Sequence, residues 1–165
     1  MYHHFVSDCT NPKPTQILDH LRLSELSTTI KHMASLSSKS SGQKNVLGQP
    51  LETCGTDPVT GFFRDGCCNT GPNDLGVHTV CCIVTEKFLA ASARLGNDLS
   101  TPMPQYGFPG LKEGDRWCVC AGRWLQVQQA GAACPVVLEA THEATLEIIP
   151  FDILLQFAVI PKTLH

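Results

Sequence analysis

Cysteine is the residue type that most constrains how this chain can fold. The sequence holds nine cysteines in 165 residues, and all but Cys9 lie between Cys54 and Cys134. In a secreted protein this density is typical of a disulfide framework, but the count is odd and no apolar signal segment precedes the cysteines. We therefore expect a cytoplasmic protein whose thiols are reduced. Such thiols serve as small hydrophobic side chains, metal ligands or nucleophiles.

The composition indicates a single globular domain and disfavours two classes of partner. Hydrophobic residues make up 42% of the chain and charged residues only 16%, which allows a real core but few long solvated helices. The net charge is −3, and no basic stripe is present of the kind that binds nucleic acid. No apolar run is long enough to cross a bilayer. We expect neither a nucleic-acid nor a membrane partner, and the oligomeric state stays open.

The chain divides into three parts that differ in composition. Residues 1–43 read as an N-terminal extension that is disordered or forms a loose helix over Gln16–Ile30, and they end in a serine-rich stretch. Residues 44–158 carry the cysteine-rich domain, and 159–165 form a tail. Met33 opens a sequence that resembles an ordinary translation start, so we hypothesise that the residues before it are an upstream extension.

Apolar segments and turn residues alternate through the domain and predict short elements. The expected strands are Val77–Thr85, Trp117–Cys120, Pro135–Ala140 and Leu146–Ile149. The expected helices are Glu86–Leu95, Ala121–Ala130 and Phe151–Ala158, with Thr85 as the cap of the first. Gly96–Gly114 reads as a long loop, a feature that is often functional. The pattern favours an α+β fold, with a small mixed sheet of short strands, two to four helices and many loops.

Motifs spread along the domain resemble one known family. They are the segments Asn45–Gly48, Thr60–Gly71, Asp74–Cys81, Gly96–Pro102, Phe108–Leu111 and Gly114–Cys120. Together they are similar to the family known as domain of unknown function 2237, across essentially the whole core. The resemblance implies a relationship but supplies no activity, cofactor or partner. Cys82 and Cys134 stand where that family usually has other residues, and Cys9 lies outside the matched part.

A metal site is the first interpretation of the thiols and the imidazole. Zinc takes about four nitrogen or sulfur ligands in a tetrahedron, and the chain offers the right ligand types. The spacing favours it less, because no C-x-x-C pair occurs. The candidate ligands are Cys54, Cys68, His78, Cys81, Cys118 and Cys120.

A thiol-dependent enzyme is the second interpretation. A reactive cysteine needs a cation, a histidine or a helix N-terminus beside it. We expect Cys68 or Cys118 as the nucleophile, with His78 and Asp74 completing a Cys-His-Asp set. Other enzyme templates fail: His142-Glu143 begins H-E-x-x-H, but Leu146 replaces the second histidine.

Charged residues in and beside glycine-rich turns predict a small-molecule cleft formed by the loops Thr60–His78 and Asn97–Gly114. Glycine permits close backbone approach, and exposed amides can hold an anion or a carbonyl. The candidate binding residues are Arg64, Asp65, Asp98, Asp115, Trp117 and Arg123. The sequence thus favours a small-molecule or metal-binding module with one Cys/His/Asp site. The alternatives are the thiol enzyme and a non-catalytic interaction domain with buried thiols.

Overall fold

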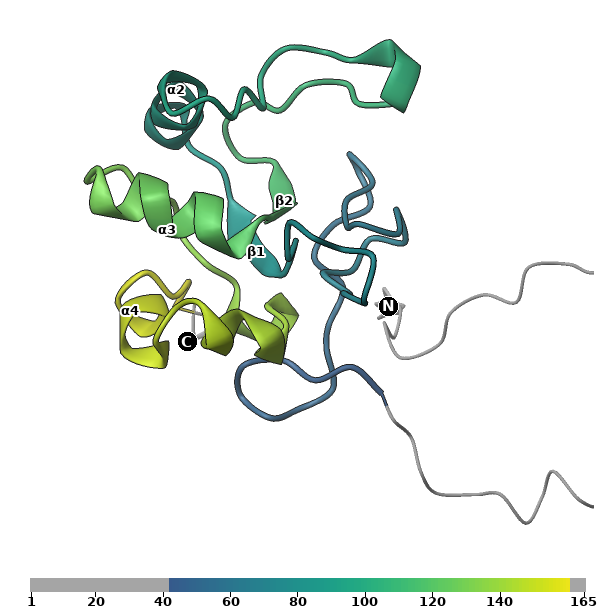
Figure 1. The fold of residues 1–165 in the computed structure, drawn as a ribbon, viewed down its shortest axis with the longest axis vertical. Coiled ribbons are helices and arrows are strands. Elements are labelled where there is room, and N and C mark those ends of the chain that lie inside the picture. Colours follow the sequence, from purple (N-terminus) through teal and green to yellow (C-terminus); the bar gives the residue numbers. More distant parts are fainter. Residues whose placement is uncertain (1–41, 161–165) are drawn as a thin grey trace, which may run out of the picture.

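A computed structural model of the chain describes residues 42–160. Two strands, β1 (Val80–Ile83) and β2 (Arg116–Val119), form an antiparallel pair at the centre of the molecule. Figure 1 shows the helices gathered on one side of this pair and the loops that precede β1 on the other. The helices are α2 (Glu86–Arg94), α3 (Ala121–Gln129) and α4 (Phe151–Gln156). Three short 3-10 helices follow loops: η1 (Pro104–Tyr106), η2 (Leu138–Ala140) and η3 (Glu143–Glu147).

The strand register places the side chains of the two faces of the pair in different clusters. Val80 lies opposite Val119 and Cys82 opposite Trp117, and these four side chains join the main hydrophobic core beneath the helices. On the other face Cys81 lies opposite Cys118, in a separate small cluster with cysteines from the loops. Because successive side chains of a strand point to opposite faces, the cysteines at 81 and 82 belong to different clusters, as the sequence predicts.

Capping and terminating residues mark the ends of the helices. The hydroxyl of Thr85 accepts the backbone N–H of Phe88 at 3.1 Å and so caps α2, which confirms the predicted cap. Gly131, at φ +74°, follows α3 in the left-handed region that glycine adopts without strain. On the inner faces Phe88 and Trp124 are fully buried, and the Trp124 indole donates to the carbonyl of Cys134 at 3.3 Å.

Two predicted strands are absent from residues 42–160. In the segment Pro135–Ala140 only Val136 makes ladder contacts, as single bridges to Cys82 and Ala158, and the chain then turns into η2. Pro135 has no N–H to extend the ladder. The segment Leu146–Ile149 begins inside η3, because the His142 ring accepts the N–H of Ala144 and starts a helical turn there. β-branched content alone did not distinguish these turns from strands.

The predicted α+β class is confirmed, with a sheet smaller than expected. The described part of the chain contains three α-helices and one antiparallel strand pair, and long loops connect them. None of the helices within 42–160 has the length and apolar character required to span a membrane. The predicted helix Gln16–Ile30 lies outside the described residues.

Candidate functional site: a Cys-His-Asp arrangement beside a cleft

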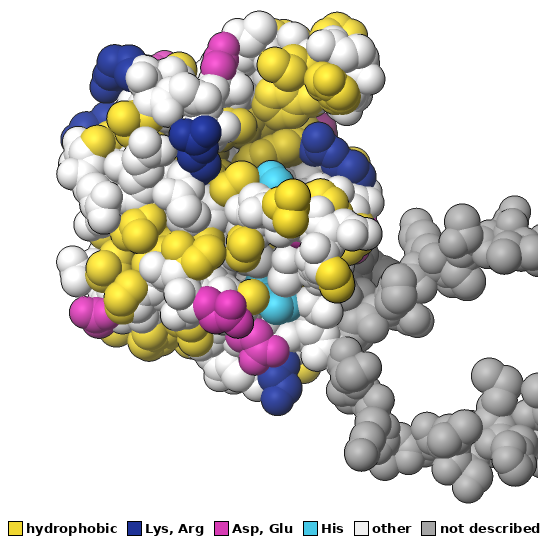
Figure 2. Space-filling model, viewed as in Figure 1, with side chains coloured by type: hydrophobic (Ala, Val, Ile, Leu, Met, Phe, Trp, Pro, Cys, Tyr) yellow, Lys and Arg dark blue, Asp and Glu magenta, His cyan; other side chains and the backbone are white. Residues whose placement is uncertain are grey.

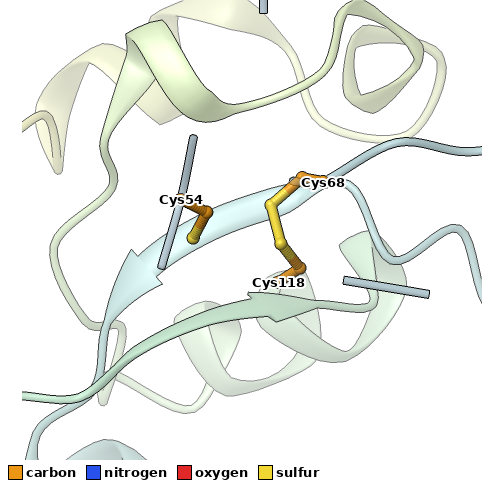
Figure 3. A group of neighbouring side chains, drawn as sticks. All are labelled: Cys54, Cys68 and Cys118. Atoms are coloured by element: carbon orange, nitrogen blue, oxygen red, sulfur yellow. A yellow bond between two sulfur atoms is a disulfide. The ribbon is translucent and has the colours of Figure 1, made fainter. Parts of the chain in front are cut away.

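Two disulfides connect the loops before β1 to the strand pair. Cys54 is bonded to Cys81 of β1, and Cys68 is bonded to Cys118 of β2, with Cα–Cα distances of 5.7 and 5.3 Å. Figure 3 shows the bond from Cys68 to Cys118, with Cys54 beside it. Four thiols expected to be reduced are therefore oxidised. The physical reason is the register, which sets Cys81 opposite Cys118 and lets each take a partner from the loop.

The same cysteines form the sulfur cluster that the metal interpretation requires, but in a different chemical state. The sulfur atoms of Cys54, Cys68 and Cys118 lie within 4.8 Å of one another, and all three residues are buried. Zinc binds the thiolate form of cysteine. Because each of these sulfurs is already bonded to another, the oxidised cluster offers no thiolate to a metal ion.

A free thiol stands elsewhere, at the start of α3. Cys120 is half-buried and occupies the N-cap position of that helix. The other free cysteines of residues 42–160 are Cys82 and Cys134, and both have no exposed surface. The sulfur of Cys120 lies beside the ring of His78, because the Cβ position at Gly76 is 3.1 Å from Sγ of Cys120 and 2.6 Å from Cε1 of His78. It is thus the one described free thiol that reaches both solvent and an imidazole.

Asp74 completes the arrangement behind the imidazole. One carboxylate oxygen of Asp74 lies 2.5 Å from Nδ1 of His78, and the other accepts the His78 backbone N–H at 2.8 Å and the Thr70 hydroxyl at 3.1 Å. The Asp74 side chain has no exposed surface, whereas 35% of the His78 side chain is exposed. The order thiol, imidazole, buried carboxylate is that of a nucleophile, a base and the group that orients the base.

The electrostatics favour a charged ring between the thiol and the carboxylate. The neighbouring Cys120 raises the pKa of His78, burial lowers it, and Asp74 raises it further, with a net result of about 9. Burial would raise the pKa of Asp74, but the hydrogen bonds from His78 and Thr70 outweigh that effect and lower it. His78 is therefore largely an imidazolium at neutral pH.

The backbone between Asp74 and His78 turns tightly enough to bring the three groups together. Val77 has φ +50°, a left-handed conformation that is rare for a β-branched residue, and its carbonyl accepts the N–H of Ala121 at 2.9 Å. This bond ties the histidine loop to the first residue of α3, directly after Cys120. Strain of this kind persists only where surrounding contacts hold it, and it is often found at functional sites.

Gly76 provides the space for the imidazole and the thiol. A Cβ atom at this position would lie 2.6 Å from Cε1 of His78 and 3.1 Å from Sγ of Cys120. Real Cβ atoms essentially never make a contact of 2.6 Å, so any other residue would displace the ring, and it would also crowd the sulfur. The backbone at Gly76 thus forms one wall of the site.

A cleft of about 400 Å³ opens on the exposed side of His78. Figure 2 shows a hollow floored by hydrophobic side chains, with a histidine and a basic side chain at its margin. The ring of Phe62 stacks on His78 at a centroid distance of 5.9 Å, and Phe108 packs against Trp117 at 5.3 Å. The cleft is lined by Gly61, Phe62, Arg64, His78, Asn97, Asp98, Leu99, Met103, Tyr106, Phe108, Trp117 and Cys118.

The predicted binding residues fall into two groups. The cleft brings together Arg64, Asp98, Trp117 and His78, which come from the two loops expected to converge and from β2. Asp65, Asp115 and Arg123 are not among its lining residues. Asp65 accepts from Asn69 and from the backbone of Cys67, Asp115 accepts the N–H of Lys112, and Arg123 donates to the carbonyl of Leu95. Their contacts hold turns and the start of α3.

The free thiol beside His78 is neither of the two predicted nucleophiles. Cys68 and Cys118, the expected nucleophiles, are bonded to each other, so neither has a free thiol. His78 and Asp74 are paired as expected, but their thiol partner is Cys120. Sequence reasoning placed Cys120 at the end of a strand and directly before a helix. A cysteine at a predicted helix N-terminus is a signal for reactivity that could have identified it.

Comparison with known proteins identifies a family but no characterised relative. No functionally curated protein matches the chain. One family model, described as "Uncharacterized protein conserved in bacteria (DUF2237)", matches residues 44–158. The match spans both strands, the three helices and every residue of the Cys-His-Asp arrangement. The chain therefore belongs to the DUF2237 family, as its sequence motifs predict.

Proposed function

We propose that this protein is a thiol-dependent enzyme that transfers an acyl group from a small molecule, with Cys120 as nucleophile. The observation that carries the proposal is that the free Cys120 thiol lies beside the ring of His78, which is paired in turn with the buried Asp74. His78, which lies beside Cys120, also lines the cleft, so the arrangement borders a space that a small molecule can enter. The proposal retains the small-molecule site predicted from the sequence, and it favours the enzyme over a module that only binds.

The reaction has two halves. The Cys120 thiolate attacks the carbonyl carbon of an ester, thioester or amide, forming a C–S bond, and the leaving group departs with the proton of the His78 imidazolium. Water then attacks the resulting thioester while neutral His78 accepts the proton of that water. The carboxylic acid leaves, and the thiolate and the imidazolium are restored. Asp74 holds the ring in orientation through Nδ1 and stabilises its charge.

The first turn of α3 supports the negative oxygen that forms during such an attack. The N–H of Ala121 is used by Val77, but the N–H groups of Gly122 and Arg123 have no acceptor among residues 42–160. A Cβ at Gly122 would meet nothing within 4 Å, so the space beside these groups is open. Free N–H groups at a helix N-terminus stabilise negative charge, as in oxyanion holes.

The test uses p-nitrophenyl acetate, a neutral activated ester. We expect a burst of p-nitrophenol about equal to the enzyme concentration, and an acetyl group on Cys120 in peptide mapping. Cys120→Ser should abolish both. His78→Ala should slow acetylation by on the order of 10²-fold or more, the usual contribution of acid–base catalysis, and Asp74→Asn should slow it less.

A matched control separates the site from general reactivity. His142→Asn removes another largely buried histidine but keeps a side-chain oxygen that can accept the N–H of Ala144. It should leave the burst unchanged. Acetylation that is unaffected by His78→Ala, or that falls mainly on Cys82 or Cys134, would contradict the proposed nucleophile.

A further inference from the structure

The cleft beside His78 contains an arginine with no carboxylate partner in the described part of the chain. The guanidinium carbon of Arg64 lies 5.0 Å from the centroid of the Trp117 ring, and one of its nitrogens donates to the carbonyl of Val59 at 3.4 Å. The only ion pair recorded within residues 42–160 joins His78 and Asp74. A guanidinium has five N–H donors, so most of those of Arg64 remain available.

The backbone of Arg64 is held in a conformation that its residue type does not favour. Its φ is +54°, in the left-handed region, and its N–H donates to the carbonyl of Gly61 at 3.1 Å in a tight turn. The turn places the planar guanidinium against the wall of the cleft that Trp117 forms. The strain and the stacking together preorganise a cation at this edge.

The one acidic residue that lines the cleft is occupied by its own turn. Asp98 accepts the hydroxyl of Thr101 at 2.6 Å and the backbone N–H groups of Ser100 and Thr101 at 2.8 and 3.2 Å. These bonds lower the pKa of Asp98, so it stays charged, but its oxygens serve the start of the loop rather than Arg64. The guanidinium of Arg64 is therefore free to bind an anionic group of a ligand in the cleft.

We propose that the substrate of this cleft is a carboxylate with an apolar body, held by a two-bond contact between its carboxylate and Arg64. This inference rests on the proposed function, because it names the substrate class of the same site. The apolar body lies against the exposed apolar side chains of the cleft, which are Phe62, Met103 and Tyr106. The carbonyl to be attacked then lies toward His78. Arginine recognises a carboxylate through two parallel bonds, which fixes orientation as well as charge.

The experiment measures equilibrium binding in the Cys120→Ser variant, where no chemistry occurs. The probes are 3-phenylpropionate and 3-phenylpropionamide, which have the same body and differ in charge. Binding is followed by NMR at the Trp117 indole N–H and the Arg64 side chain. We expect the carboxylate to bind about tenfold more tightly than the amide, and Arg64→Gln to remove that difference without weakening amide binding.

Two control variants sharpen the result. Arg123→Gln removes an exposed arginine outside the cleft and should leave both affinities unchanged. Arg64→Lys keeps the charge but loses the planar fork, so it should restore only part of the preference. Equal affinity for both probes, no binding of either, or an unchanged preference in Arg64→Gln would each overturn the inference. Since the binding arm uses no thiol, it stands or falls separately from acetylation of Cys120.

Discussion

At the scale of single residues, His78 links the site to the stability of the fold. Its pKa is raised from 6.5 to about 9, so the folded protein stabilises the protonated ring. This contribution is complete below pH 6.5, where the unfolded chain is protonated as well, and it is lost as the pH rises through about 9. We expect the urea midpoint to fall across this range in the wild type.

The same titration reports on the thiol. Because the neighbouring Cys120 is the largest cause of the raised pKa of His78, the Cys120→Ser variant should show a smaller fall in the midpoint between pH 6.5 and 9. Two-dimensional NMR of the His78 ring should show its titration moving to lower pH in this variant. A His78 ring that titrates near 6.5 in the wild type would contradict the charged pair.

Gly76 offers a substitution that perturbs the site without removing any of its groups. Gly76→Ala places a methyl group 2.6 Å from Cε1 of His78, so the ring must move away from Cys120 or Asp74. We expect alkylation of Cys120 by iodoacetamide to slow by on the order of tenfold or more as the imidazolium leaves the sulfur. Gly122→Ala adds the same methyl group where nothing lies within 4 Å, and it should fold normally.

At the scale of elements, the caps and stops of the helices were accessible to prediction from sequence. Thr85, the periodic apolar residues of α2 and the glycine after α3 are local signals, and each acts over a few residues. The segment 135–149 was not predictable in the same way. There, distant partners such as Ala158 for Val136 determine the path, and they override the strand preference of the sequence.

The cap of α2 gives a prediction at this scale. Thr85→Ala removes the acceptor of the Phe88 N–H and should lower the free energy of unfolding by about 1 kcal/mol. Chemical denaturation measures the loss, and Thr85→Ser, which retains the hydroxyl, should recover most of it. Cys120 acetylation should be unaffected in both variants, since α2 contributes no side chain to the Cys-His-Asp arrangement.

At the scale of the whole molecule, the disulfides hold one segment to the sheet at both of its ends. Residues 54–68 begin at a bond to β1 and end at a bond to β2, and the Thr60 hydroxyl accepts the Cys118 N–H at 2.8 Å between them. Removing either disulfide should lower the free energy of unfolding by about 2–4 kcal/mol. The ring closed by Cys68 and Cys118 spans 50 residues and that closed by Cys54 and Cys81 spans 27.

Paired serine variants test this account of the disulfides. Because the unfolded chain loses more freedom when a longer ring is closed, Cys68→Ser with Cys118→Ser should cost about 0.5 kcal/mol more than Cys54→Ser with Cys81→Ser. Denaturation curves under non-reducing conditions give the comparison. Equal midpoints for the wild type and both double variants would show that the bonds do not stabilise the fold.

The sequence predicts the imidazole and the carboxylate as a pair, but it offers Cys120 only as a metal ligand and not as the thiol of this set. Asp74 and His78 are four residues apart, so a local turn suffices to pair them. The choice among the cysteines depended instead on strand register, which sets Cys81 opposite Cys118 and commits both to loop partners. Register between strands more than thirty residues apart is a tertiary property, and no spacing along the chain encodes it.

The attachment of residues 54–68 has a consequence for where such a catalyst can operate. Phe62 and Arg64 of this segment form one side of the cleft, while the proposed nucleophile, Cys120, has to stay reduced. Strong reductants should therefore break the disulfides that hold this side of the cleft and weaken substrate binding. Strong oxidants should oxidise the Cys120 thiol and abolish its reactivity. We expect turnover to be greatest at an intermediate ratio of reduced to oxidised glutathione. The redox state of the surroundings would then regulate the activity.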